Sequence, residues 1–164
     1  MITRIEQLLL IGWREWCQLP QLYIPAIKAK IDTGARTSSL HAFNMRVENR
    51  KNKYYVKFSV NPIQGNTSIA VDCESLLVDE RAVTSSTGHR EHRYIILTPI
   101  TLGAQTREIE LSLSNRDPLK FRMLLGREAL KNFAVIDPNR SFCQGRIKRN
   151  QIETLYLTNG IKRL

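Results

Sequence analysis

The sequence predicts an all-β fold whose strands close on themselves. Apolar residues recur at alternate positions through most of the chain, which is the period of a half-buried strand, and helical periodicity is nearly absent. Turn-forming residues separate the alternating segments at short intervals. Because antiparallel strands joined by short turns leave edges that must be covered, we expect a closed barrel or a sandwich.

Seven segments carry the strand pattern. In the first, alternation turns Tyr23 and Ile27 toward one face and Lys28 and Lys30 toward the other. In the fifth, the apolar residues point inward and the polar residues, Ser112 among them, point outward. The predicted strands are 23–31, 54–60, 76–78, 94–97, 108–113, 121–125 and 133–136.

The remaining elements are a helix and a hairpin turn. One short helix is predicted at 127–131, where Arg-Glu-Ala-Leu-Lys are good helix formers. The polar segment 84–90, which contains one glycine, predicts a hairpin turn.

A length of 164 residues suits a single domain over 1–164, because two domains would each be near the lower limit for burying a core. Within it, 146–164 is expected to be a basic C-terminal extension.

The composition is that of a folded domain with a basic surface. Hydrophobic residues make up 42% and charged residues 24%, and no stretch has the ~20 apolar residues that span a bilayer, so we expect a cytoplasmic protein. Cys17, Cys73 and Cys143 are far apart and form no CxxC pair, which favours reduced, buried thiols. The 25 Lys and Arg against 15 Asp and Glu give a net charge of +10, which suits acidic partners.

The most informative segment is Asp32-Thr33-Gly34-Ala35, at the end of the first predicted strand. Gly34 lets the backbone turn tightly and approach a ligand or a second chain, and the Thr33 hydroxyl can hold the loop. Asp32 is thereby exposed at the turn, where a carboxylate can take part in chemistry. Asp-Thr-Gly is also an ordinary turn sequence, in which the Asp would only cap the turn.

Two downstream features accompany this loop: the strand 121–125, which closes on Gly-Arg, and the hairpin 84–90. In this order the sequence resembles the retropepsin-like aspartic peptidases, in which a strand leads to Asp-Thr-Gly-Ala, a flap hairpin follows, and a strand ending in Gly passes behind the loop. More narrowly, IDTGARTSSLHA, TGHREHRYI, SNRDPLKFRMLLGREAL and DPNRSF resemble the bacterial family labelled ATP-dependent zinc protease, which is associated with ATP-grasp glutamate ligases of the RimK type. The resemblance covers roughly 12–145.

The resemblance implies a retropepsin-like closed barrel and an aspartic peptidase site. Arg36 stands where the retroviral members usually carry Asp, and we expect it to repel Arg127. The expected site consists of Asp32 for catalysis; Thr33, Gly34 and Ala35 in the active-site loop; Ser86, Gly88 and His89 in the flap; and Leu125, Gly126 and Arg127 in the supporting strand.

The aspartic mechanism requires two carboxylates that share one proton, one as base toward water and one as acid. The chain has a single Asp-Thr-Gly, so the second carboxylate must come from another copy, and we expect a homodimer with paired Asp32 side chains. The expected activity is hydrolysis of peptide bonds without a cofactor. The resemblance implies a glutamate-modified protein tail as substrate and a functional link to an ATP-grasp glutamate ligase.

Two other functions stay open. The family label points to a zinc hydrolase, with His41, His89, His92 and Cys73 as the available ligands. The HExxH pattern is missing, and His89 and His92 would point to opposite faces of a strand, so no metal site is expected. No GxxxxGK[ST] loop is present, so any ATP dependence would belong to a partner. The other alternative is a non-catalytic module that binds peptides or nucleic acids on the same fold.

Overall fold

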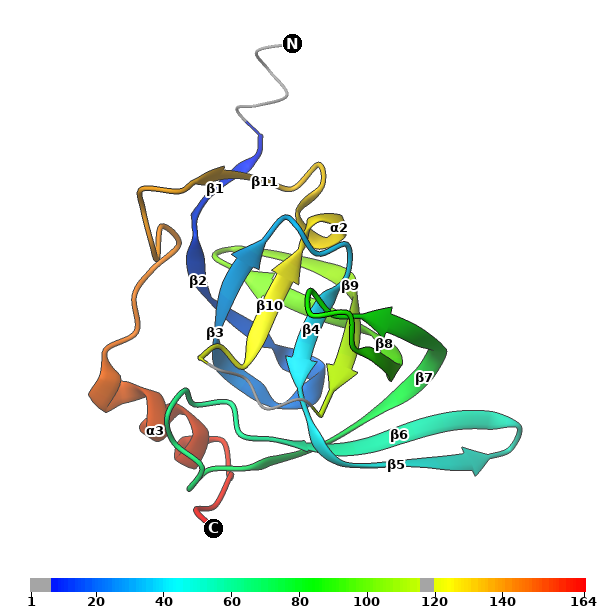
Figure 1. Ribbon diagram of the computed structural model, residues 1–164. Coiled ribbons are helices and arrows are strands. Elements are labelled where there is room, and N and C mark those ends of the chain that lie inside the picture. The colour runs from blue at the N-terminus through cyan, green and yellow to red at the C-terminus, as the bar shows by residue number, and fades with distance from the viewer. Residues whose placement is uncertain (1–6, 116–119) are drawn as a thin grey trace.

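Six strands follow one another around a barrel (Figure 1). The computed structural model describes residues 7–115 and 120–164. The order around the barrel is β2 (Arg14–Leu19), β3 (Ile24–Asp32), β10 (Met123–Gly126), β4 (Ser38–His41), β9 (Gln105–Ser114) and β8 (Arg90–Leu102). Pairing of Cys17 in β2 with Leu102 in β8 closes the barrel. The all-β fold with a closed barrel, predicted from the sequence, is therefore confirmed.

Three more strands extend the sheet beyond β8. They are β7 (Val71–Thr84), β6 (Lys53–Val60) and β5 (Phe43–Arg50). The β5–β6 hairpin projects from the barrel as a long arm (Figure 1). The hairpin formed by β7 and β8 turns at 85–89, within the predicted turn 84–90.

Shorter elements cover the ends of the barrel. The strands β1 (Leu9–Gly12) and β11 (Ala134–Asp137) form a separate parallel pair. The helices are η1 (Pro20–Leu22), α2 (Arg127–Leu130), which lies within the predicted 127–131, and α3 (Arg149–Thr158). In Figure 1, β1, β11 and α2 lie at the end of the barrel where β3 and β10 finish. No helix in the described ranges is long and apolar enough to cross a membrane.

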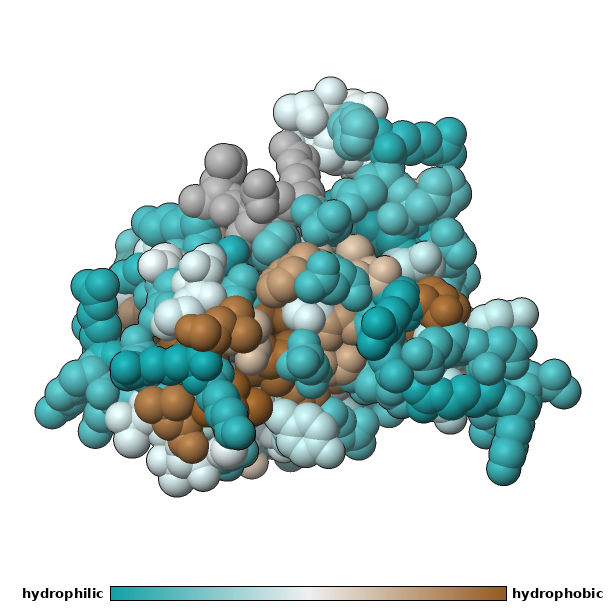
Figure 2. Space-filling view, turned by 90° about the horizontal axis from the view of Figure 1, so that it is seen from below, coloured by the Kyte–Doolittle hydropathy of each residue, from teal (hydrophilic) through white to brown (hydrophobic). Residues whose placement is uncertain are grey.

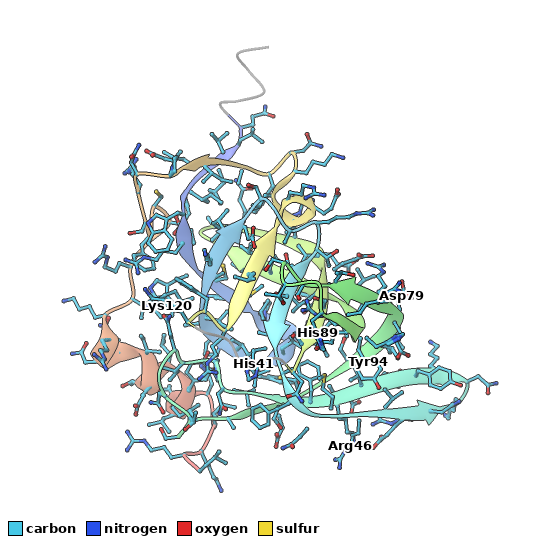
Figure 3. All side chains as sticks on the ribbon, viewed as in Figure 1. His41, Arg46, Asp79, His89, Tyr94 and Lys120 are labelled. Atoms are coloured by element: carbon cyan, nitrogen blue, oxygen red, sulfur yellow. The ribbon has the colours of Figure 1, made fainter. Side chains whose placement is uncertain are left out.

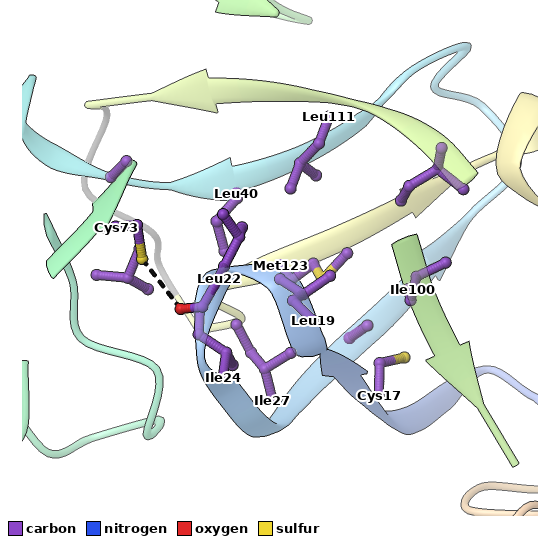
Figure 4. Packing of buried hydrophobic residues seen from close by; sticks show 14 of the residues in the cluster. Cys17, Leu19, Leu22, Ile24, Ile27, Leu40, Cys73, Ile100, Leu111 and Met123 are labelled. Atoms are coloured by element: carbon purple, nitrogen blue, oxygen red, sulfur yellow. Dashed lines mark hydrogen bonds between the residues drawn. The ribbon is translucent and has the colours of Figure 1, made fainter. Parts of the chain in front are cut away.

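Alternating apolar residues of the barrel strands form one hydrophobic core (Figure 4). Ile27, Leu40, Leu111 and Met123 each contribute a fully buried side chain from a different strand. Cys73 belongs to this core, and its thiol donates a hydrogen bond to the Leu22 carbonyl (3.4 Å). Burial raises the pKa of the Cys73 thiol to about 12, so this cysteine is an inert core residue.

Several details differ from the sequence-based expectation. Tyr23 does not face the core: it ends η1 with φ 57° and is 71% exposed, because the chain turns there before β3 begins. Ser112 is buried rather than outward, and its hydroxyl donates to the Ser38 carbonyl across the β4–β9 pairing. Helix α3 was not predicted, and it lies in the stretch expected to be a basic extension. Its Tyr156 is fully buried and donates a hydrogen bond to the Ala26 carbonyl.

The molecule also exposes apolar surface. Viewed from below, apolar side chains gather between hydrophilic margins (Figure 2). Leu76 on β7 and Leu97 on β8 are among the exposed large apolar residues of the described chain. Both line a shallow pocket of about 280 Å³ beside η1.

Candidate active site

Asp32 is the last residue of β3, and the parallel pairing of β3 with β10 places Gly126 directly beside it. The residues after Asp32 turn at once: the Ala35 amide donates to the Asp32 carbonyl (3.2 Å), and the Gly34 amide donates to Asp32 Oδ1 (3.1 Å). Asp32 is half-buried, whereas Thr33 and Gly34 are exposed. The carboxylate is therefore held at the mouth of a tight loop, at one end of the barrel.

Gly126 allows the strand β10 to pass directly behind this loop. A Cβ at this position would lie 2.7 Å from the Thr37 carbonyl carbon and 2.9 Å from the Ala35 oxygen, closer than real side chains come. Two hydrogen bonds donated by backbone amides join the two segments: the Arg127 amide donates to the Ala35 carbonyl (2.8 Å), and the Gly126 amide donates to the Ser38 side-chain oxygen Oγ (3.0 Å). Leu125, in the same strand, is buried in the core.

The Arg127 side chain holds the loop from the other side. Its guanidinium Nη1 lies 3.4 Å from the Thr33 carbonyl and 3.2 Å from the Gly34 carbonyl, and donates to both. The expected repulsion between Arg36 and Arg127 is reduced by the negative charge of Glu110, which interacts with Arg36. The pKa of Glu110 is lowered chiefly by hydrogen bonds from Arg81, with the positive charge of Arg36 contributing.

The hairpin predicted as a flap turns through Ser86, Gly88 and His89, all of which are exposed. Gly88 adopts φ +80°, and the Ser85 hydroxyl accepts a hydrogen bond from the His89 amide (3.1 Å). Figure 3 labels His89 at the tip of this hairpin. No hydrogen bond or ion pair among the described residues joins the three flap residues to Asp32. The closing role therefore stays a prediction.

The candidate metal ligands are separated in the structure. His89 and His92 are exposed on the β7–β8 hairpin, His41 is half-buried at the end of β4, and Cys73 lies in the core. In the part of the chain that the structure describes, no group of three or more His, Cys, Asp or Glu side chains is placed to hold a metal ion. The described residues thus offer a carboxylate site and no ready set of zinc ligands.

One group of residues beside Asp32 was not among the site residues expected from the sequence. Lys28 and Lys30 alternate with buried residues of β3 and lie on the same face as Asp32. Strand pairing adds Arg14, opposite Lys30, and Trp16, opposite Lys28. The alternation of the lysines is visible in the sequence, but the pairing of β2 with β3 is needed to place the other two beside them.

Comparisons with known proteins agree with this geometry. A model of the family described as RimB-like, retropepsin-like aspartic endopeptidase RimB, matches residues 10–147. The crystal structure of a Legionella pneumophila protein with unknown function superposes with a TM-score of 0.69 at 28% identity, covering 83% of this chain and 98% of that one.

The curated relatives carry a different name. The probable alpha-L-glutamate ligase of Shewanella halifaxensis is 46% identical over 94% of this chain, and that of Shewanella pealeana is 48% identical over 93%. These matches cover 34% and 33% of the relatives, so the chain spans about a third of their length. The family match, by contrast, takes in the Asp32 loop, the β7–β8 hairpin and the strand ending in Gly126 and Arg127. The chain belongs to the RimB-like family of retropepsin-like aspartic endopeptidases.

Proposed function

We propose that the chain is an aspartic endopeptidase that works as a homodimer, with one Asp32 from each copy. The observation that carries the proposal is the Asp32 loop in a chain of the RimB-like family. Gly126 packs directly against this loop, and the Arg127 side chain donates a hydrogen bond to its Gly34 carbonyl. The chain supplies one such loop, and the chemistry needs two carboxylates that share a proton.

In the proposed reaction, the ionised Asp32 of one copy takes a proton from water while the protonated Asp32 of the other donates its proton to the scissile carbonyl oxygen. The water oxygen bonds to the carbonyl carbon and forms a tetrahedral intermediate. The C–N bond then breaks as the leaving amine receives a proton, and the hydroxyl proton of the intermediate returns to the carboxylates. Thr33 would lock the two loops together, Gly34 and Ala35 would line the cleft, and Ser86, Gly88 and His89 would close over the peptide.

The β1–β11 pair supports a second copy at this end of the barrel. It lies at the end where β3 and β10 finish (Figure 1). Leu10 and Val135 are direct partners in this pair and are 41% and 39% exposed. Adjacent exposed apolar side chains are typical of an interaction surface. We therefore propose this surface as the dimer contact.

For the substrate, we propose a protein tail that carries added glutamates. Two observations support it: the net charge of +10, and the name alpha-L-glutamate ligase on relatives of which a third resembles this chain. The chain would act in the cytoplasm on the product of an ATP-grasp glutamate ligase.

The first prediction is that Asp32→Asn abolishes cleavage of a peptide that ends in several glutamates, because an amide cannot act as the base. Mass spectrometry of the products measures cleavage, and the thermal transition checks folding. Asp72→Asn is the matched control: Asp72 is exposed on β7 and accepts a hydrogen bond from Ser59 (2.7 Å), and its change should leave turnover intact. Retained turnover in Asp32→Asn would rule out the aspartic mechanism.

The basic charge also supports a second candidate, a non-catalytic module that binds nucleic acid or peptides. Salt-sensitive binding of RNA that is unchanged by Asp32→Asn, together with an absence of hydrolysis by the wild-type chain, would favour this function over the peptidase.

A further inference from the structure

The outer face of β3 and its neighbours concentrates positive charge behind Asp32. Lys28, Lys30 and Asp32 occupy alternate positions of β3 and lie on one face. Arg14 of β2 is the direct partner of Lys30. We call Arg14, Lys28, Lys30 and Arg122 the basic face.

Arg122 joins this face from the other side of β3. Its neighbour Met123 is fully buried, so alternation turns Arg122 outward. The pairing of β10 with β3 begins at Met123, which is the partner of Ala29, so Arg122 lies just before the paired stretch, about level with Lys28 along the strands. The Arg122 carbonyl accepts a hydrogen bond from the His41 amide (2.9 Å), so the backbone here continues the pairing of β10 with β4.

Aromatic rings support two of these cations. The Arg14 guanidinium carbon lies 4.5 Å from the ring centre of Trp13 and 4.9 Å from that of Phe142. The Lys28 ammonium lies 5.3 Å from the Trp16 ring centre and 5.9 Å from that of Phe142. At these distances each cation is attracted to the electron-rich ring faces, which limits the freedom of its side chain.

Phe142 is fixed over β2 by a segment distant in sequence. The Phe142 amide donates to the Arg14 carbonyl (3.0 Å). The next residue is held by Glu15, which is fully buried and accepts a hydrogen bond from the Cys143 amide (2.7 Å). The rings and their cations are therefore part of the folded framework rather than of a mobile tail.

The four cations of the basic face take part in no ion pair with another residue of 7–115 or 120–164. Among the described residues, the buried Nε of Arg14 has no hydrogen-bond partner. Burial lowers the pKa of Lys28, and the charges of Arg14, Lys120 and Arg149 lower it further. Figure 3 shows Lys120 near the start of β10. Positive charge gathered in this way favours an anionic ligand.

We propose that the basic face binds the carboxylates of an acidic stretch of polypeptide and so selects substrates for Asp32. The proposal rests on the proposed peptidase function and names how its substrate is recognised. From Lys28 to Asp32 the strand covers about 13 Å, the length of about four extended residues. A stretch of about four glutamates would match it.

The geometry favours carboxylates over nucleic acid. Nucleic-acid sites without sequence preference use open aromatic faces on which bases stack. Here the rings of Trp13, Trp16 and Phe142 are already faced by cations, and Arg146 lies 5.0 Å from the Phe142 ring centre as a third cation on that ring. The donor groups of Arg14 and Lys28 remain the chemistry that a ligand can use.

The test measures binding in Asp32→Asn protein, so that the peptide is not cleaved. Trp13 and Trp16 are the two tryptophans of the chain, so intrinsic fluorescence reports on this face. The probes are peptides that end in four glutamates or in four glutamines, and a single-stranded RNA. We expect saturable, salt-sensitive binding of the glutamate peptide and at least tenfold weaker binding of the glutamine peptide.

Lys28→Gln combined with Lys30→Gln should weaken binding of the glutamate peptide about tenfold or more. The matched control is Lys51→Gln combined with Lys53→Gln, which removes two charges from exposed lysines of the β5–β6 arm. It should change the affinity for the glutamate peptide less than about twofold, because salt screens the effect of distant surface charges. Thermal transitions of each double variant confirm folding.

Equal binding by the two double variants, equal binding of the two peptides, or tighter binding of the RNA would each overturn the proposal. The outcome is separate from that of the peptidase test. A wild-type chain that binds the glutamate peptide through Lys28 and Lys30 and fails to cleave it would contradict the proposed function while supporting the basic face.

Discussion

The environment of Gly126 shows how a single residue fixes the Asp32 loop. Two segments that are more than 80 residues apart in sequence approach so closely there that no side chain fits between them. Hydrogen bonds donated by the amides of Gly126 and Arg127 then join the segment 35–38 to the end of β10. The position of Asp32 therefore depends on a glycine that contributes no side chain.

The second prediction follows: Gly126→Ala should destabilise the fold by about 1–3 kcal/mol, because the loop must move to admit a methyl group. Its activity should fall further than its stability explains. Urea unfolding and peptide cleavage measure the two effects. Gly65→Ala is the control. A Cβ at Gly65 would meet no atom within 4 Å, so its only cost is the left-handed backbone conformation, φ +72°. This variant should lose about 1–2 kcal/mol and keep its activity. Equal activity in the two variants would show that the close approach at Gly126 does not position the site.

At this scale, part of the site was predictable and part was not. Asp32, Gly126 and Arg127 stand out in the sequence because the motif and its spacing are characteristic. The partners of Arg127 are main-chain carbonyls of the loop, and a carbonyl leaves no mark in the residue types. The basic face was hidden because Arg14 reaches it through the pairing of β2 with β3, and Arg122 reaches it through its place just before β10, which pairs with β3.

Among the elements, the β5–β6 arm is joined to β7 by antiparallel pairing of β6 with β7, and ion pairs around Arg50 add to this contact. Arg50 Nη1 lies 2.6 Å from Glu74 on β7, and Arg50 Nη2 lies 2.7 Å from Glu48. Hydrogen bonds from Arg50 are the main cause of the lowered pKa values of both carboxyl groups. Because these groups are exposed, the pairs contribute modestly and are sensitive to salt.

The third prediction concerns acid. A carboxyl group with a lowered pKa in the folded state binds fewer protons there than in the unfolded state. Its stabilising effect is present above the ordinary pKa of 4.5 and is lost as the pH falls through the lowered value. Arg50→Gln should therefore reduce stability at pH 7 more than at pH 3, as measured by thermal unfolding. Lys53→Gln should show no such difference, and an Arg50→Gln loss that is constant with pH would contradict the assignment.

Strands were easier to predict than the C-terminal helix. The alternation in β3, β6 and β9 is strong because one face of each strand contributes to the core. Helix α3 buries only Ile152 and Tyr156, four residues apart, so its apolar pattern is short and surrounded by polar residues. The helix is stabilised by contacts with residues distant in sequence, including the hydrogen bond from Tyr156 to the Ala26 carbonyl.

At the scale of the whole molecule, the barrel brings the site to one end. Parallel β3 and β10 finish together, so Asp32 and the start of α2 face the same direction as the β1–β11 pair (Figure 1). The sequence predicted that the sheet closes, but not that β2 and β8 are the closing strands. Their pairing joins segments that are far apart in the sequence. A second copy placed against this end would bring two Asp32 loops together.

Such a pair has a recognisable dependence on pH. Two adjacent carboxyl groups cannot both ionise easily, so the protons leave in two separate steps that belong to the pair. Activity should be bell-shaped on the acidic side of neutrality, and specific activity should fall on dilution as dimers separate.

The most direct test of the paired-carboxylate account mixes wild-type and Asp32→Asn chains at constant total concentration and lets them re-associate. If each active site needs an Asp32 from both copies, every mixed dimer is inactive, and activity falls with the square of the wild-type fraction. Mixing with Asp72→Asn chains controls for dilution and handling. Activity that falls only in proportion to the wild-type fraction, from a species that sedimentation shows to be a monomer, would contradict the account.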